Sequence, residues 1–194
     1  MHILAISPGL GFEADRWRAV LHSGIDAFMI REKQLEARAL LDLARRVQDL
    51  APEVELWVNG RLDVALAAGS GLHAPEAYPD VDPGLLRLSR PLHEESQWAK
   101  RRGCAQLLIA PVFPSPGKGP AWGVERLRRF LDGLPEGQRL LALGGVGAEN
   151  SVSLQHPRLD GVALVRALWD SGDPGEVVAA LRSTWSDSIR ATSP

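Results

Sequence analysis

Eight short apolar segments recur along the chain and are separated by segments with helical periodicity. Each has four to six residues and is mostly apolar, which is typical of buried parallel strands. Between them, apolar residues recur at the spacing of amphipathic helices, as do Leu40, Ala44 and Val47. Eight strands joined by right-handed crossovers predict an α/β protein with one compact (β/α)8 TIM barrel. The predicted strands are Ile3–Ser7, Ala27–Arg31, Glu55–Asn59, Gly71–Ala74, Leu86–Arg90, Ala105–Ala110, Arg139–Leu143 and Gly161–Val165.

The length sets how much chain each unit of the barrel can use. The 194 residues leave about 24 per unit, so we expect short helices and tight loops. The fourth crossover, over residues 75–84, contains Pro79, Pro83 and Gly84 and is expected to be irregular. If one of the two neighbouring segments, Gly71–Ala74 or Leu86–Arg90, were a loop, an open doubly wound sheet would be the alternative fold. We expect a single domain over residues 1–186 and a polar tail over 187–194.

The composition excludes several classes of function. The 22 basic and 24 acidic residues give a net charge of −2, so we expect no nucleic-acid or membrane partner. The single cysteine, Cys104, excludes an internal disulfide and a zinc site built from several thiolates. The sequence has no signal-peptide pattern and no apolar run of about 18 residues, so we expect a cytoplasmic protein.

Basic residues gather where the predicted strands end. In a (β/α)8 barrel the functional site lies at the carboxyl ends of the strands. Like charges held together there repel one another unless an anion neutralises them, which predicts an anionic ligand. The basic residues concerned are Arg31, Lys33, Arg61, Arg90, Lys118 and Arg166.

A Gly-Gly turn follows the seventh predicted strand. Gly144 and Gly145 let the backbone approach a ligand closely, and N–H groups there can bind phosphate. Barrels commonly bind phosphate after strands seven and eight. We therefore expect Gly144, Gly145 and Arg166 to bind a phosphate group.

The motifs at the strand ends resemble those of a known superfamily. In order, they match the thiamine phosphate synthase superfamily, which includes the synthase and the TenI proteins, some of them thiazole tautomerases. The resemblance covers nearly the whole chain and implies a barrel that binds phosphorylated thiazole or thiamine-related compounds. The matching segments are residues 28–33 (FMIREK), 58–66 (VNGRLDVAL), 71–73 (GLH), 111–114 (PVFP) with Lys118, and 141–146 (LALGGV).

Both metal-binding aspartates of the synthase pattern are missing. The resemblance places one in an Asn-Asp-Arg motif, where this chain has Gly60, and a second after strand four, where residues 73–78 contain no aspartate. Mg²⁺ needs carboxylate ligands, so we expect no cofactor, and Mg²⁺ only if synthase activity is retained.

Asn59-Gly60-Arg61 is instead similar to the TenI pattern, which favours a thiazole tautomerase. That reaction moves a ring proton and needs an acid or base. The resemblance places a histidine in this role at a position where this chain has Pro111. His73 and Glu32 are therefore the catalytic candidates, and His93 is a weaker one. The resemblance to the synthase also fails at Pro91, where that enzyme has a serine.

Arg31, Lys33, Asn59 and Lys118 complete the predicted substrate-binding residues. Plainer roles stay open: Asn59 can hold the rim by backbone hydrogen bonds, Glu32 can pair with the nearby bases and Arg166 can lie in solvent. Two tryptophans also follow predicted strands and could stack on a heterocycle or belong to the core. They are Trp122 and Trp169.

Three functions stay open at this point. The first is a TenI-like protein, possibly a thiazole tautomerase in activity, and the second is a thiamine phosphate synthase (thiamine-phosphate pyrophosphorylase). The third is a paralogue that binds a phosphorylated ligand without catalysis. The expected partner is a small phosphorylated molecule, and a homodimer is compatible with the sequence.

Overall fold

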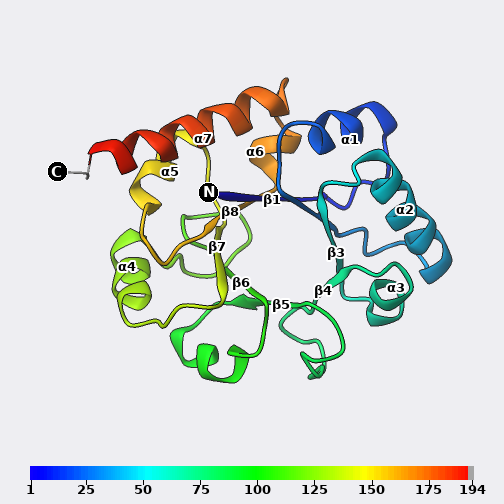
Figure 1. Cartoon of the computed structure of the whole chain (residues 1–194), viewed down its shortest axis with the longest axis horizontal. Coiled ribbons are helices and arrows are strands. Elements are labelled where there is room, and N and C mark those ends of the chain that lie inside the picture. Colours follow the sequence, from blue (N-terminus) through cyan, green and yellow to red (C-terminus); the bar gives the residue numbers. More distant parts are fainter. Residues whose placement is uncertain (192–194) are drawn as a thin grey trace.

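The computed structural model describes residues 1–191 and shows a closed barrel of parallel strands (Figure 1). The barrel closes between the first and last strands, where His2 pairs with Gly161. A Cβ atom at Gly161 would overlap the carbonyl oxygen of His2, so a glycine permits the closure. The (β/α)8 prediction is confirmed, and the open-sheet alternative is wrong. The strands are β1 (His2–Ile6), β2 (Ala27–Ile30), β3 (Glu55–Asn59), β4 (Gly71–His73), β5 (Leu88–Leu92), β6 (Gln106–Ile109), β7 (Arg139–Leu143) and β8 (Gly161–Leu164).

Helices surround the barrel (Figure 1). The last of them, α7, extends to Ala191 and so enters the range expected to be a polar tail; residues 192–194 lie outside the described part of the chain. Within residues 1–191 no helix combines the length and the hydropathy that a membrane crossing requires. The helices are α1 (Ala14–Leu21), α2 (Ala37–Leu50), α3 (Leu62–Ala67), α4 (Val124–Asp132), α5 (Ala148–Ser151), α6 (Arg166–Trp169) and α7 (Pro174–Ala191), with 3-10 helices η1 (Glu95–Arg101) and η2 (Val152–Leu154).

Apolar side chains fill the space on both sides of the strands. Alternate strand residues point outward to the helices or inward to the barrel axis, as the period of two requires. Trp57 fills much of the interior, and Gly71 on the neighbouring strand makes room for its ring, which a Cβ atom there would overlap. The interior cluster consists of Leu4, Ile6, Ala27, Met29, Trp57, Leu108, Leu141 and Ala163.

The fourth crossover contains no helix, as predicted from its prolines. Arg90 takes the place of a helical apolar face there, because its buried guanidinium donates hydrogen bonds to three backbone carbonyls of the crossover. The acceptors include Tyr78 at 3.0 Å and Pro79 at 2.8 Å. The prediction that Arg90 belongs to the basic rim is therefore wrong: it points outward from the barrel.

β5 begins and ends two residues later than predicted, because Pro91 lies inside the strand. Proline has no N–H to donate to a neighbouring strand, and it normally marks a strand edge. Here β4 is short and pairs with β5 only as far as Ser89. No β4 residue lies opposite Pro91, so no hydrogen bond to β4 is lost there.

Candidate functional site

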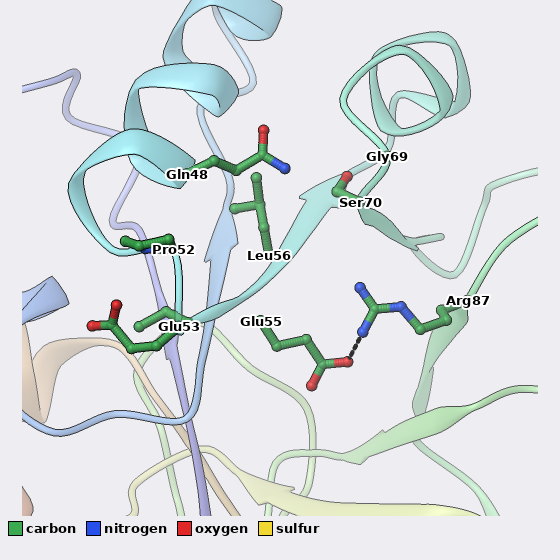
Figure 2. Close-up of a pocket in the computed structure, with 9 residues that line it drawn as sticks. Gln48, Pro52, Glu53, Glu55, Leu56, Gly69, Ser70 and Arg87 are labelled. Atoms are coloured by element: carbon green, nitrogen blue, oxygen red, sulfur yellow. Dashed lines mark hydrogen bonds and ion pairs between the residues drawn. The ribbon is translucent and has the colours of Figure 1, made fainter.

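A cavity of about 860 Å³ opens at the carboxyl ends of the strands. Every residue predicted to bind the substrate or to act in catalysis lines it, except Glu32. A smaller cavity of about 360 Å³ lies at the opposite end of the barrel, where Figure 2 shows Glu55 of β3 paired with Arg87. Glu55 also pairs with Arg139 at 2.6 Å, so both of these basic side chains already have an acidic partner. The larger cavity is the candidate site.

Four basic side chains in the larger cavity have no acidic partner in the part of the chain whose side chains are described. Arg31 and Lys33 follow β2, Lys118 follows β6 and Arg166 begins α6 after β8. Among the described side chains, those of residues 1–185, none of the four forms an ion pair. Their charges are available to an anion.

These basic residues form two groups around the mouth of the barrel. One group lies at the ends of β2 and β3, where Asn59 adds an amide. The other lies after β6, β7 and β8, where the Gly144–Gly145 turn stands between Lys118 and Arg166. In the strand order, β1 separates the groups on one side and β4 with β5 on the other. The cavity thus has two regions suited to anions.

The Gly144–Gly145 turn requires both glycines. Their φ angles are +98° and +67°, in the left-handed region that favours glycine. A Cβ atom at Gly144 would lie 2.8 Å from Cβ of Pro111, and one at Gly145 would lie 2.7 Å from Cβ of Phe113. The loop after β6 therefore packs directly on the turn, and Phe113 N–H donates to the Gly144 carbonyl at 2.9 Å.

His73 lines the cavity, but its imidazole is held in the barrel wall. Its Nδ1 lies 2.9 Å from Oγ of Ser89. Burial, together with the charges of Arg90 and Arg31, lowers the pKa of His73 to about 3. The ring is neutral at physiological pH, so it is poorly suited to donate a proton in acid–base catalysis.

Glu32 is directed away from the cavity. Its buried carboxylate accepts hydrogen bonds from the backbone N–H groups of Gly9 and Gly11 and from the amide of Gln34. These bonds hold the loop between β1 and α1 against the end of β2, so the Glu32 carboxylate has a structural role.

The carboxylates near the cavity do not fit a bound Mg²⁺. Gly60 has a φ of +68° and offers no side-chain oxygen, and the Glu76 carboxylate already accepts from Arg101 at 2.7 Å and Gln97 at 3.0 Å. Within the described residues, no three His, Cys, Asp or Glu side chains gather in a way that could hold a metal ion. The described residues around the cavity therefore do not fit a metal ion.

Three predicted features lie outside the cavity. Arg61 is wrong as a member of the basic rim, because it pairs with Asp63 at 2.7 Å. Trp122 is buried against Phe130 and under Arg126, and Trp169 donates to the Ile6 carbonyl at 2.7 Å. Both tryptophans belong to the core and cannot stack on a ligand.

The cavity also contains acidic residues that the sequence reasoning did not single out as site residues. They are Glu76, Glu149 and Asp170. The one available signal was their position shortly after strands four, seven and eight. His93, a weaker candidate, also lines the cavity, and its Nδ1 lies 2.7 Å from the Ala110 carbonyl oxygen.

The fold and the site together define a (β/α)8 barrel with an unpaired basic cavity at the carboxyl ends of its strands. Comparison with known proteins assigns it further. The family model described as thiamine monophosphate synthase matches residues 12–168, so the chain belongs to this family.

Curated relatives support the same assignment. The thiamine-phosphate synthase of Albidiferax ferrireducens is 33% identical over 185 residues, covering 87% of this chain and 82% of the relative. That of Syntrophomonas wolfei is 30% identical over 184 residues, covering 87% and 86%. These relatives carry the synthase name, and the predicted placement nearer the TenI proteins is not supported by them.

Solved structures confirm the fold. Thiamine phosphate pyrophosphorylase from Pyrococcus furiosus superposes with a TM-score of 0.83 at 21% identity, covering 97% of this chain and 96% of that one. Orotidine 5'-phosphate decarboxylase from Pyrococcus horikoshii has a TM-score of 0.69 at 15% identity, covering 94% and 99%. Barrels of this shape thus occur in proteins with different names, and the site has to carry the functional argument.

Proposed function

We propose that the protein is a thiamine-phosphate synthase, which joins a pyrimidine diphosphate to a thiazole phosphate. The observation that carries the proposal is the set of four unpaired basic residues in two groups around one cavity. Two anionic reactants need two such regions. The synthase relatives make these two reactants the natural choice.

The basic side chains would bind and orient the reactants. In the reaction, the thiazole nitrogen forms a bond to the methylene carbon of the pyrimidine, and the C–O bond to the diphosphate breaks with its electron pair leaving on the diphosphate. Negative charge grows on that leaving group, and fixed cations such as Arg31 and Lys33 stabilise growing charge most effectively when they are already in place. The Gly144–Gly145 turn, Lys118 and Arg166 would hold the thiazole phosphate.

A tautomerase has less support from the same residues. It needs an acid or base in the cavity, and the two groups proposed for that role are a neutral, buried His73 and a Glu32 that lies elsewhere. The synthase step needs stabilisation of negative charge, which the four basic side chains of the cavity can supply.

The test supplies the purified full-length protein with both reactants and measures pyrophosphate release and thiamine phosphate together. We expect equal amounts of each, with no release when the thiazole phosphate is omitted. A Lys33→Ala, Lys118→Ala double variant should lose most of the rate. Lys100→Ala is the matched control, because Lys100 is exposed on η1 and does not line the cavity.

Two results would replace the proposal. Thermal stabilisation by thiamine phosphate without turnover would indicate a binding paralogue. Deuterium uptake from solvent into the carboxythiazole phosphate, with no pyrophosphate released, would indicate a tautomerase, with His93 as the next group to test.

A further inference from the structure

A row of three polar side chains crosses the inner wall of the barrel beneath the cavity. His73 on β4 pairs in register with Ser89 on β5, and Ser89 pairs with Gln106 on β6. The Ser89 hydroxyl is fully buried and lies 2.9 Å from Nδ1 of His73 and 3.3 Å from Nε2 of Gln106.

The chemistry of the three groups sets the direction of these hydrogen bonds. The Gln106 amide can only donate through Nε2, so Ser89 Oγ accepts from it. The Ser89 hydroxyl has one proton, and His73 Nδ1 is the one acceptor found for it in the described residues. Ser89 therefore donates to Nδ1, and a neutral imidazole must then carry its proton on Nε2.

The orientation of the Gln106 amide decides this assignment. In the orientation observed, its Oε1 is buried without a partner. The reversed amide would present an acceptor to Ser89 and would require the Nδ1–H tautomer of His73, which is the outcome that the first test below distinguishes.

The second ring nitrogen of His73 faces the ligand space. His73 lines the cavity and is 7% exposed. Among the side chains that the structure describes, residues 1–185, its Nε2 has no hydrogen bond and is not one of the buried atoms without a partner, so solvent reaches it. We propose that Gln106 and Ser89 are positioning residues that fix His73 as the Nε2–H tautomer, a constant hydrogen-bond donor to an acceptor atom of the ligand. Only the identity of that ligand rests on the proposed function.

This role agrees with the electrostatics of the ring. The low pKa of His73 keeps it neutral across the physiological range, so its donor does not change with pH. The acceptor can be a ring nitrogen or a phosphate oxygen, because both accept a single N–H.

The first test is nitrogen NMR of the unaltered, ¹⁵N-histidine-labelled protein. A His73→Gln variant identifies the His73 signals among those of the five histidines. We expect a protonated Nε2 and an unprotonated Nδ1 that shows the upfield shift of a hydrogen-bonded acceptor. A proton on Nδ1 would overturn the proposal, and this measurement needs no substrate.

The second test removes the hydroxyl. In Ser89→Ala the Nδ1 signal should move downfield, and in Ser89→Thr it should return. Ser70→Ala is the matched control, because the buried Ser70 hydroxyl contacts only backbone carbonyls. An unchanged Nδ1 signal in Ser89→Ala would remove Ser89 from the role.

Ligand binding separates this proposal from the proposed function. We expect Ser89→Ala to bind thiamine phosphate roughly fivefold more weakly, the usual effect of one neutral hydrogen bond, and Ser89→Thr to recover most of the loss. If the unaltered protein does not bind thiamine phosphate, the proposed function fails while the tautomer result stands. Equal binding by Ser89→Ala would show that the ligand does not depend on this positioning.

Discussion

The carboxylate of Glu32 accepts a hydrogen bond of 2.8 Å from the backbone N–H of Gly11 and so holds the first loop of the barrel against the second strand. A second bond joins it to the N–H of Gly9 at 3.1 Å. Both acceptor oxygens of the side chain are thereby used for structure, which explains why a charged residue is buried at this position.

Glu32→Ala should therefore lower stability more than it lowers ligand binding. Removing the acceptors leaves two backbone N–H groups without partners, which costs about 1–3 kcal/mol for a buried group. Urea unfolding measures the loss, and Glu32→Gln, which keeps one acceptor oxygen, should lose less. Unchanged stability together with a complete loss of turnover would place Glu32 in the chemistry instead.

Gly145→Ala should weaken phosphate binding on the order of tenfold. The added methyl group would push the loop at Phe113 off the turn and misplace the N–H groups of the turn. A hydrogen bond to a charged group contributes about 1.5–3 kcal/mol. Titration calorimetry with inorganic phosphate gives the affinity. Gly123→Ala is the matched control: its φ is +71° against +67° at Gly145, and no atom lies within 4 Å of its added methyl group. Equal losses in both variants would attribute the effect to backbone strain alone.

Gly60→Asp should strengthen the effect of Mg²⁺ on anion binding, because it supplies a carboxylate that the unaltered chain lacks at this position. The added Cβ would be 3.8 Å from Pro75, so the side chain fits, and Asp tolerates a positive φ better than most residues. We expect Mg²⁺ to strengthen inorganic pyrophosphate binding in this variant beyond its effect on the unaltered protein. Gly60→Asn has the same shape without the charge and should behave like the unaltered protein. A strong Mg²⁺ effect in all three proteins would show that other groups hold the metal.

His73 should make the protein less stable as the pH falls from about 6.5 to about 3. The pKa of His73 is lowered from 6.5 to about 3 in the folded state, so in this window the unfolded chain binds a proton that the folded chain does not. The stability is fully present above the unfolded pKa and is lost toward the folded pKa, at up to about 1.4 kcal/mol per pH unit. Unfolding curves of the unaltered protein and His73→Gln, compared at several pH values, isolate this contribution from that of the carboxylates. Parallel stability curves for the two proteins would contradict it.

Glu149→Gln should strengthen the binding of inorganic phosphate. The Glu149 carboxylate lies against the backbone of Gly147, close enough that a Cβ atom there would overlap it, and both residues line the cavity beside the Gly144–Gly145 turn. Removing one negative charge from this region should raise the affinity roughly two- to tenfold at low salt, and added salt should reduce the gain. Glu136→Gln, an exposed residue away from the cavity, should have no effect. No gain in Glu149→Gln would mean that the carboxylate moves aside when the anion binds.

The barrel and most of the site residues could be predicted because both depend on local sequence patterns. Parallel strands buried on both faces are short apolar segments, and the residues that follow them share one end of the barrel. This reasoning places Lys118 and Arg166 in one cavity although they are far apart in the sequence.

The errors arose where the direction of a side chain decides its role. Arg90 and Arg61 follow or end strands as Arg31 does, but Arg90 points outward and Arg61 pairs with Asp63. Glu32 looked like a catalytic carboxylate because the sequence does not show which backbone N–H groups fold back on it. The bounds of β5 were missed for a similar reason. A proline is accepted inside this strand because β4 ends before it, and the sequence does not show where β4 ends.

In the crossover between β4 and β5, one residue, Arg90, holds the backbone against the barrel by hydrogen bonds. In the helical crossovers, several apolar side chains share this role. Between β4 and β5, one guanidinium satisfies three carbonyls that no helix covers, so the short chain length of this barrel is obtained at the expense of redundancy. Substitution of Arg90 would therefore leave three backbone carbonyls of this wall without their donor at once.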